Sequence, residues 1–414
     1  MRDEERALHT QVGIVGAGPA GLMLAHLLHL EGIESVVLDA RSRETIETTV
    51  RAGVLEDHVA GLLRETGVGE RMDREGAVHH GIELRFGGRG HRLDFADLTG
   101  GRSIVLYGQQ EVVKDLGRAR LEAGGTVIWE AEAVELCDLE TDAPRIRFRT
   151  GPMVDESRLR RGGDLEELTC DVIAACDGYW GPGRRHIPEA IRTEYERSYP
   201  FAWFGVLAEA PRSADELVYT NHERGFSLVS TRSPTIQRLY FQCDPDEAAE
   251  NWPDDRVWEE LRTRTQTEDG WDLKEGRILE KIVVGMRSFV CSPMQHGRLF
   301  LAGDAAHIVP PTGAKGMNLA IADVRVLTRG IVDLLRDGRT EVLDRYSETC
   351  LRRVWKAQRF SWWMTSMLHR FGDDPFQRGL QLAELDYIAG SRAAATALAE
   401  NYVGLPLDPL SVRA

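Results

Sequence analysis

The pattern of apolar and polar positions is clearest at the start of the chain. An apolar run at residues 12–15 precedes a glycine-rich turn, and residues 22–28 then carry apolar side chains at helical spacing. A second apolar run, residues 35–38, ends in Asp39. This order predicts a β-α-β unit over residues 10–40, with a tight turn between the first strand and the helix.

Strand-like and helix-like patterns continue through the first half of the chain. Residues 80–106 alternate polar and apolar positions and predict strands, whereas Gln109 begins a helix that runs to about Ala123. The other expected elements are an amphipathic helix through Leu62 and Leu63, strands of a small sheet at 126–129 and 146–148, a surface hairpin loop at 151–168 and a buried strand at 171–178.

Residues 199–243 predict a largely antiparallel region. Ser230 and Arg232 share one parity, and Arg238 and Tyr240 share one parity on the run after the next turn. Pairing about that turn would put Ser230 opposite Tyr240. It would also put Arg232 opposite Arg238, with all four side chains on one face. Such a face could be a solvated sheet surface, or the floor of a pocket that grips a carboxylate with guanidinium and hydroxyl donors.

The second half of the chain becomes helical after one more strand. Residues 298–302 form an apolar run that ends in Gly303-Asp304, and Pro310 to Gly316 follow. A helix then keeps apolar positions at helical spacing, namely Ala320, Ile321, Val324, Leu327, Ile331 and Leu334. The remaining chain is expected to be mostly helical.

Composition limits the classes of function. The chain has 414 residues, which favours two or three domains, and a formal charge of -15, which argues against nucleic acid as a partner. No apolar stretch is long enough for a membrane span, and the charged N-terminus lacks the apolar core of a signal peptide. The six cysteines are scattered without metal-binding spacing, so no metal site is expected and free thiols in a cytoplasmic protein are the simplest interpretation.

The glycine-rich turn is the first candidate for chemistry. Gly16 allows a tight turn, Gly18 lets the backbone approach a diphosphate, and Gly21 lets helix and strand pack closely. The helix N-terminus would face the phosphates, and Asp39 could accept a hydrogen bond from a ribose hydroxyl. The turn therefore predicts a dinucleotide site, although an ordinary tight turn is the alternative and position alone does not distinguish FAD from NAD.

Three motifs in this order resemble the single-component FAD-dependent aromatic hydroxylases: the glycine turn, Asp177-Gly178 and Gly303-Asp304. The segments 51–56, 294–316, 360–364 and 400–406 are similar to the members of that family that hydroxylate 4-hydroxybenzoate at the 3-position. The resemblance covers nearly the whole chain. It implies FAD as resident cofactor, NADH or NADPH as co-substrate, O2, a small aromatic acid as substrate and a homodimer.

The resemblance also implies a fold and its division. We expect an α/β (mixed α+β) protein with a Rossmann-like FAD-binding domain, an inserted antiparallel-sheet substrate domain and a helical C-terminal region. The expected FAD-binding domain is discontinuous, over 1–79, 107–182 and 288–320. The substrate-binding sheet covers 80–106 and 183–287, and 321–414 would form the helical region and dimer interface.

Site residues carry over from the family position by position. Ser230, Arg232 and Tyr240 would bind the substrate carboxylate, and Pro311 would face the substrate ring. Tyr219, Tyr402 and His79 would form a proton path from the substrate phenol to solvent. The residues expected to contact FAD are Gly16, Gly18, Ala20, Gly21, Asp39, Arg51, Gln109, Arg238, Asp304, Lys315, Gly316 and Asn318. Those expected to contact NAD(P)H are Arg41, Arg51, Arg184 and Arg287.

The chemistry of this family explains these residue types. Hydroxylation through a flavin hydroperoxide needs the ring as a phenolate, and a free phenol titrates near 10, so the site must remove that proton. An arginine clamps the opposite, anionic end of the substrate. His307 is interpreted as a packing or turn residue rather than a base, whereas Lys315 could be solvated or could act electrostatically beside the flavin.

The chain departs from the family pattern in the nucleotide path. NADPH-dependent members carry a basic-Gln pair, a tyrosine and an arginine where this chain has Ala40, Arg41, Thr45 and Thr49. We therefore expect a weakened preference for NADPH, with NADH accepted as well. The alternative is that Arg41 meets a 2′-phosphate from a shifted position, and the sequence does not decide between the two nucleotides. Trp180 replaces a histidine in the same region, and its role is left open.

Other functions fit the same motifs less well. A related enzyme would act on another para-substituted benzoate, such as 4-aminobenzoate or 3,4-dihydroxybenzoate. A non-catalytic FAD sensor would not need Tyr219, Tyr402, His79 and Arg232 together, and a plain dehydrogenase would not need the second and third flavin motifs.

Overall fold

The computed structural model describes residues 8–49, 53–155 and 160–407. Its first layer is a six-stranded sheet that is parallel except at one edge. In spatial order its strands are β21 (Gln295–His296), β22 (Leu299–Leu301), β15 (Val172–Ala175), β2 (Val12–Val15), β3 (Ser35–Asp39) and β9 (Thr126–Trp129). Every residue of β2 and β15 is buried, as continuous apolar runs in a parallel sheet require.

Helices and a second sheet cover the two faces of this layer. Helix α1 (Pro19–Leu30) packs between α6 (Gln109–Glu122) and α8 (Gly316–Asp337). On the other face, Ile146 of a four-stranded sheet reaches the backbone of β2 at Gly13, where an added Cβ would lie 2.6 Å from the isoleucine side chain. That sheet contains β1 (Leu8–His9), β14 (Leu165–Thr169), β11 (Arg145–Arg149) and β10 (Glu132–Cys137).

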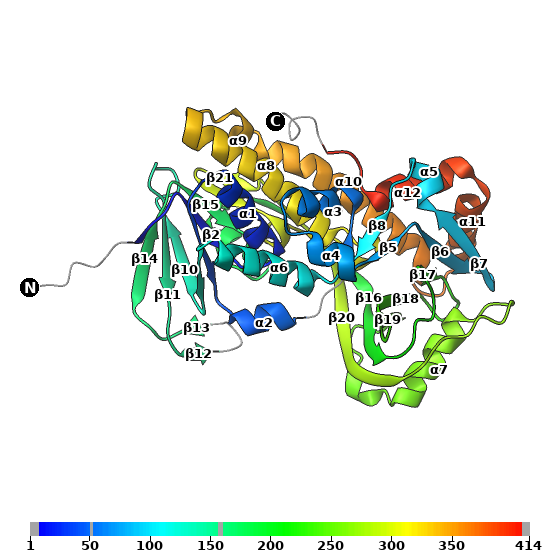
Figure 1. Cartoon of the computed structure of the whole chain (residues 1–414). Coiled ribbons are helices and arrows are strands. Elements are labelled where there is room, and N and C mark those ends of the chain that lie inside the picture. Colours follow the sequence, from blue (N-terminus) through cyan, green and yellow to red (C-terminus); the bar gives the residue numbers. More distant parts are fainter. Residues whose placement is uncertain (1–7, 50–52, 156–159, 408–414) are drawn as a thin grey trace, which may run out of the picture.

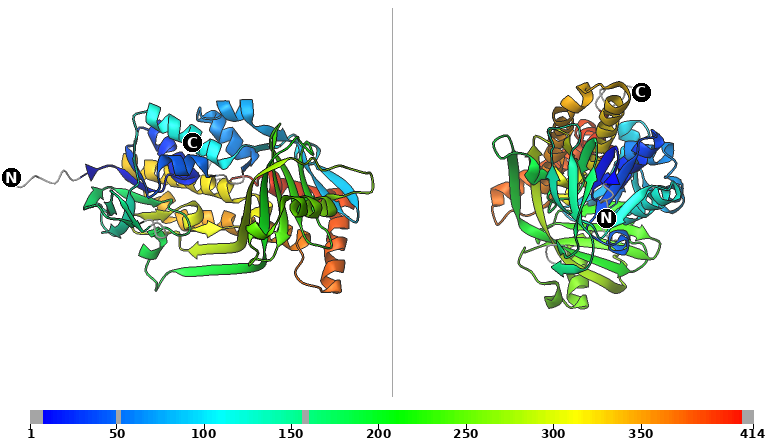
Figure 2. Two further views of the ribbon diagram at one scale, coloured as in Figure 1. Left: turned by 90° about the horizontal axis from the view of Figure 1, so that it is seen from below. Right: turned by 90° about the vertical axis from the view of Figure 1, so that its left-hand side faces the viewer.

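An eight-stranded, mostly antiparallel sheet forms the other end of the elongated molecule (Figures 1 and 2). Its order is β23 (His307–Ile308), β20 (Arg277–Ser292), β16 (Thr193–Glu209), β19 (Ile236–Cys243), β18 (Ser227–Ser233), β17 (Leu217–Thr220), β6 (Gly81–Phe86) and β7 (Arg89–Asp94). The long strands β16 and β20 pair along almost their whole length, and β20 extends to β23 next to the Gly303-Asp304 turn. The sheet is thereby joined to the first layer.

Smaller elements complete the chain. A three-stranded sheet of β4 (Val54–Leu55), β8 (Ile104–Leu106) and β5 (Ala77–His79) lies between the two large sheets (Figure 1). The C-terminal helices are α9 (Glu341–Asp344), α10 (Tyr346–Leu368), α11 (Pro375–Gly390) and α12 (Arg392–Val403). The remaining pieces are α2 (Arg43–Thr48), α3 (Asp57–Glu65), α4 (Glu70–Glu75), α5 (Phe95–Thr99), α7 (Asp254–Thr265), a two-stranded pair of β12 (Met153–Asp155) and β13 (Arg160–Arg161), and the 3-10 turns η2 (Gly183–His186), η3 (Ala249–Asn251), η4 (Gly303–Ala305) and η5 (Pro311–Gly313).

The predicted fold class is confirmed, but three local predictions were wrong. Residues 126–129 belong to the six-stranded sheet as β9, because they pair with β3 rather than with 146–148. Residues 95–99 form α5 instead of a strand, since Asp94 caps the backbone N–H of Asp97 and starts a helical turn.

The third correction concerns the pairing of β18 with β19. Ser230 lies opposite Arg238, and Leu228 lies opposite Tyr240, so the predicted register is shifted by two residues. The register shifts between Thr231 and Ser233, so Arg232 is an extra residue on β18 with no paired residue on β19. The alternation of polar and apolar positions does not reveal this irregularity. A shift of two residues keeps the same face, so the polar side chains remain together.

Candidate active site

The glycine turn after β2 is packed tightly at two positions and open at one. A Cβ added to Gly16, whose φ is +106°, would lie 2.2 Å from the carbonyl oxygen of Cys176, and one added to Gly21 would lie 1.9 Å from that of Gly16. Among the described residues, a Cβ on Gly18 would meet nothing within 4 Å, and no side chain caps the N-terminus of α1 that follows. The turn therefore leaves free N–H groups and space where a diphosphate would lie.

The acid at the end of β3 faces this turn. Asp39 accepts hydrogen bonds from the backbone N–H of Ala17 (2.7 Å) and of Arg41 (2.9 Å). On the other side of the turn, Asp177 is half-buried, and its buried Oδ1 has no hydrogen-bond partner among the described residues. Burial raises the pKa of Asp177 to about 6, against the hydrogen bond from the N–H of Gly183. These groups fit the adenosine half of FAD.

Substitutions at the two glycines should separate cofactor binding from folding. Gly18→Val would place its side chain in the open space, so we expect a protein with near-normal thermal stability that contains little FAD. Gly21→Val would drive a side chain into the Gly16 carbonyl, so we expect a loss of stability of several kcal/mol. Flavin absorbance per chain and thermal unfolding measure the two effects. Normal FAD content in Gly18→Val would contradict this assignment.

A buried ion pair fixes the second flavin motif. His307 Nε2 lies 2.6 Å from Asp323 Oδ2, which also accepts the N–H of Gly303 at 3.0 Å. Burial lowers the pKa of His307, but the carboxylate of Asp323 outweighs burial and the net pKa is raised. The pair holds the turn that carries Asp304. Asp323 was not predicted as a site residue, although an acidic residue beside the apolar positions of α8 could have indicated it.

The N-terminus of α8 is open, but its side chains are engaged within the protein. Gly316 has no atom within 4 Å of an added Cβ. Lys315 donates to Glu56 Oε1 (2.7 Å) and to the backbone carbonyls of Tyr402 (3.0 Å) and Asn401. All three of its protons are therefore used, and it would affect FAD only through its charge.

Asn318, another predicted cofactor residue, is similarly occupied. Its Oδ1 accepts the N–H of Glu56 and its Nδ2 donates to the carbonyls of Val54 and Ala314, each at 2.9 Å. Glu56 thus joins β4 to α8, and Lys315 joins both to the C-terminal helix α12. Glu56 was not predicted as a site residue, although it lies in the recognised segment 51–56.

The floor of the candidate substrate site lies on β18 and β19. Arg238 is buried, and it donates from Nε to the Tyr240 hydroxyl (3.2 Å) and from Nη1 to Glu280 (2.7 Å). The Nε of Arg232 is buried without a partner among the residues described. Burial lowers the pKa of Arg232, and the nearby Tyr240 only partly offsets this. A desolvated guanidinium with a free donor is the group that an entering carboxylate would satisfy.

Two tyrosines from distant parts of the chain meet in the interior. The hydroxyl of Tyr219, on β17, lies 2.5 Å from the hydroxyl of Tyr402, on α12. The Tyr402 ring packs on Phe95 at 5.1 Å and on Phe360 at 6.1 Å between ring centroids. Burial raises the pKa of both hydroxyls above the usual range, so both stay protonated and can pass a proton only along their hydrogen bond.

His79 is buried near this pair but does not touch it. Its Nδ1 has no partner in the described part of the chain. The next residue, His80, accepts from the N–H of Phe95 (2.6 Å), and Phe95 packs on Tyr402. Burial lowers the pKa of His79 to about 4, against the raising effect of Glu216. The imidazole is therefore neutral at pH 7 and able to accept a proton, and any link to Tyr402 needs an intervening group such as water.

Acidification should destabilise the fold between about pH 6.5 and pH 4. These limits are the pKa of His79 in the unfolded chain, 6.5, and its pKa in the folded chain, about 4. Within that window the unfolded state binds the proton that the folded state excludes, so stability falls as the pH falls. His58, whose pKa burial also lowers to about 4, adds to the effect. His79→Gln should flatten the dependence of the melting temperature on pH, and the exposed-site control His9→Gln should not. Equal slopes in all three proteins would contradict the pKa assignment.

The structure describes the positions of most of the remaining predicted site residues. Gln109 is the first residue of α6, and Pro311 begins η5, which packs on α10. Arg51 lies outside the described residues. Arg184 and Arg287 are brought together, with their guanidinium carbons 4.5 Å and 4.7 Å from the centroid of the Tyr179 ring. Trp180 packs edge-on against that ring and is 76% exposed.

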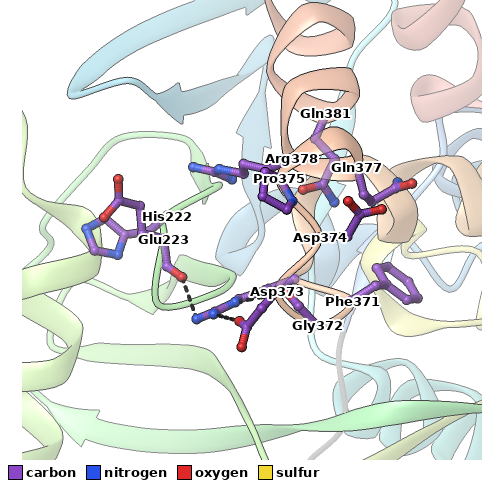
Figure 3. Close-up of a pocket in the computed structure, with 11 residues that line it drawn as sticks. His222, Glu223, Phe371, Gly372, Asp373, Asp374, Pro375, Gln377, Arg378 and Gln381 are labelled. Atoms are coloured by element: carbon purple, nitrogen blue, oxygen red, sulfur yellow. Dashed lines mark hydrogen bonds and ion pairs between the residues drawn. The ribbon is translucent and has the colours of Figure 1, made fainter.

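A cavity of about 340 Å³ lies away from all of these residues. Figure 3 shows it between the loop after β17 and the start of α11. Arg370, which also lines the cavity, is bonded to Glu223 and Asp373. We do not place the chemistry there, because none of the predicted side chains reaches it. Across residues 8–49, 53–155 and 160–407, no group of acids, histidines and cysteines could hold a metal ion, and no helix is long and apolar enough to cross a membrane.

Comparison with known proteins identifies the family of the chain. The model of the FAD binding domain family matches residues 9–361. The p-hydroxybenzoate hydroxylase of Acinetobacter baylyi is 45% identical over 404 residues, which cover 97% of each chain. The probable NADH-specific resorcinol 4-hydroxylase of Rhodococcus jostii is 24% identical over 81% of this chain and 61% of its own length.

Solved structures share the fold at low identity. The p-nitrophenol 4-monooxygenase of Pseudomonas putida superposes with a TM-score of 0.80 at 19% identity, over 97% of this chain and 100% of its own. Aklavinone-11 hydroxylase, solved with FAD and aklavinone, gives a TM-score of 0.69 at 20% identity, over 89% of this chain and 70% of its own.

Proposed function

The chain belongs to the FAD-dependent aromatic hydroxylases, and from that membership we propose that it hydroxylates 4-hydroxybenzoate at the 3-position, giving 3,4-dihydroxybenzoate with O2 and NADH or NADPH. The observation that carries this proposal is the buried contact between the hydroxyls of Tyr219 and Tyr402. Tyr219 lies on the sheet that also carries Arg232, whereas Tyr402 reaches it from α12. A phenol at one end of the substrate and a carboxylate at the other match these two features.

Each end of the substrate would meet a different group. Arg232 would pair with the carboxylate, and the hydroxyls of Ser230 and Tyr240 would orient it. The backbone of Pro311 would lie against the ring. Tyr219 would donate to or accept from the phenol oxygen and pass its proton to Tyr402, and from there to His79 and solvent. The ring then carries the negative charge that makes it nucleophilic.

FAD, when bound, supplies the reduction of O2 and the transfer of one oxygen atom to the ring. The chain would hold it at the open turn over Gly18, with Asp39 on the ribose and Asp304 and the N-terminus of α8 toward the flavin. Arg238 would lie beside the ring system. The apolar residues around Tyr402 exclude water, which protects the oxygen transfer from loss as peroxide.

Product analysis tests this function directly. FAD-loaded protein with 4-hydroxybenzoate, NADH and O2 should form 3,4-dihydroxybenzoate in a near one-to-one ratio to NADH oxidised. The same measurement with 4-aminobenzoate and 3,4-dihydroxybenzoate tests the two related substrates. Oxidation of NADH that gives only peroxide with all three would overturn the proposed substrate class, and no stimulated oxidation at all would favour the sensor.

NADH should be the better electron donor. Arg41, the basic residue nearest the positions that bind a 2′-phosphate in NADPH-dependent relatives, is bonded to Asp39 through Nε (3.3 Å), so part of its guanidinium is already engaged. We expect a higher kcat/KM with NADH than with NADPH, and Arg41→Ala should leave the NADH value within a few-fold. A large advantage of NADPH in steady-state rates would contradict this prediction.

We also propose a homodimer formed through the helical region 321–414 and a cytoplasmic location. All six cysteines are free, which supports a reducing compartment.

A further inference from the structure

A buried histidine at the end of α10, His369, uses both of its ring nitrogens. Its Nε2 lies 2.7 Å from the indole Nε1 of Trp203, and its Nδ1 lies 3.0 Å from the carbonyl oxygen of Thr365. The carbonyl oxygen can only accept, so Nδ1 carries the proton, and the indole can only donate, so Nε2 is the acceptor. The two neighbours therefore hold the imidazole in one tautomer and one orientation.

The imidazole stays neutral at physiological pH. Burial lowers the pKa of His369 to about 3, against the hydrogen bond to Thr365, which raises it. A second ring proton would also point at the indole N–H of Trp203, which is itself a donor. The neutral ring satisfies the one polar group of the Trp203 side chain.

Trp203 belongs to a row of aromatic rings that joins the two polar ends of the candidate substrate site. Its ring packs against Tyr240 (4.9 Å between centroids) and stacks on Phe226 (5.0 Å). Phe226 in turn packs against Tyr219 (6.2 Å). Tyr240 belongs to the proposed carboxylate end and Tyr219 to the proposed phenol end. The pair of Trp203 and Phe226, here called the aromatic wall, therefore contacts both ends at once.

His369 contacts both members of the aromatic wall. Its ring stacks on Phe226, with 4.3 Å between centroids and 23° between the planes. It is nearly coplanar with Trp203, at 6°, which is the arrangement that a hydrogen bond from the indole to an imidazole lone pair needs. Phe201 also stacks on the imidazole, at 4.7 Å. Packing and directed hydrogen bonds thus hold the wall together.

The last turn of α10 also reaches the turn that would face the substrate ring. The hydroxyl of Thr365 lies 3.0 Å from that of Thr312, the residue after Pro311. From α11, Gln381 donates to the backbone carbonyl of His369 (2.6 Å), which holds this helix end in place. The imidazole is therefore a fixed point between the Pro311 turn and the aromatic wall.

We propose that His369 is a positioning residue for the substrate. By accepting the indole N–H of Trp203 it fixes the aromatic wall, and the wall holds the substrate ring in the orientation in which oxygen transfer outruns the loss of peroxide. This role rests on the proposed hydroxylation. Without the imidazole acceptor, the buried indole N–H would be left unsatisfied, and Trp203 would turn away from its place in the wall.

Two substitutions separate the hydrogen bond from packing. His369→Phe keeps a ring that can stack on Phe226 but has no acceptor, whereas His369→Gln loses the ring but can accept from Trp203 through its side-chain oxygen. FAD-loaded protein is given 4-hydroxybenzoate, NADH and O2. The ratio of 3,4-dihydroxybenzoate to peroxide should fall by about fivefold to a hundredfold in His369→Phe, the range for an unsatisfied buried donor, and by much less in His369→Gln.

The order of the two variants and the KM distinguish positioning from a purely structural role. A residue that only fills the core would tolerate phenylalanine better than glutamine, which is the opposite order. The KM for 4-hydroxybenzoate should stay within about threefold of the wild type in both variants, because Arg232 still pairs with the carboxylate. His91→Phe is the matched control, since His91 also stacks on a phenylalanine, Phe86 (4.4 Å), but on the edge strand β7 of the same sheet. It should leave the ratio unchanged.

A variant of the donor keeps the test open if His369→Phe does not fold. Trp203→Phe removes the indole N–H and should lower the ratio similarly, and adding His369→Gln to it should cause no further loss. An unchanged ratio in His369→Phe or Trp203→Phe, or a loss in His369→Gln that equals that in His369→Phe, would overturn the role of His369 alone. Wild-type protein that hydroxylates none of the three benzoates would overturn the proposed function, and this role with it.

Discussion

Arg232→Ala is expected to raise the KM for 4-hydroxybenzoate by a factor between about thirty and several thousand. This factor corresponds to a loss of about 2–5 kcal/mol in binding free energy. The reason is that the substrate carboxylate would enter a desolvated site without its cation. Within the described part of the chain the Arg232 Nε is buried without a hydrogen-bond partner, so this donor is available to the ligand. Equilibrium binding, followed by the change in flavin absorbance, should weaken by the same factor.

Two further variants make this result specific. Arg232→Lys should recover only part of the affinity, because a single ammonium cannot reproduce the planar donors of a guanidinium. Arg277→Ala, at an exposed arginine of the same sheet that pairs with Glu209, should leave the KM unchanged. A KM for Arg232→Ala within threefold of the wild type would move the carboxylate site elsewhere.

Tyr219→Phe is expected to lower the rate of product formation by about 100- to 10,000-fold, the range for loss of a positioned proton-transfer group. The substrate would still bind through Arg232, so oxidation of NADH should continue and yield peroxide. Activity should recover as the pH rises toward about 10, where the phenol loses its proton without help. The ratio of product to NADH oxidised, measured across pH, gives both results.

Substitutions of two other tyrosines distinguish the loss of the proton path from an effect on packing. Tyr402→Phe leaves the Tyr219 hydroxyl in place but removes its partner at 2.5 Å, so we expect the same defect at smaller size. Tyr199→Phe removes a hydroxyl that contacts Ser288 (3.2 Å) outside the proposed path, and it should have no effect. Coupled product formation in Tyr219→Phe at pH 7 would show that another group takes the phenol proton.

Much of the cofactor half of the site could be predicted from sequence because its geometry is local. The turn from Gly16 to Gly21 joins two adjacent elements, and steric limits at each glycine act over a few residues. The helices α1, α3 and α6 and the buried strand β15 followed from periodicity for the same reason. The predicted parity of Ser230, Arg232, Arg238 and Tyr240 survived the two-residue shift in register because strand faces alternate with a period of two.

Contacts between distant segments could not be predicted from local pattern. The irregularity at Arg232 depends on how β18 and β19 pair, and the assignment of 126–129 to the large sheet depends on β3. The engagement of Lys315 by Glu56 and by the backbone of α12 uses residues more than 80 positions apart. No spacing rule relates such residues.

The sequence by itself determined the dinucleotide turn and the residue types on the substrate sheet, because these follow from short-range sterics and from periodicity, whereas the fold class was implied by the resemblance to a known family. Only the tertiary structure brought the hydroxyls of Tyr219 and Tyr402 together, left the Arg232 Nε unpaired among the described residues and buried His79. Those properties depend on which surfaces become buried against each other, and burial is decided by the packing of the whole chain.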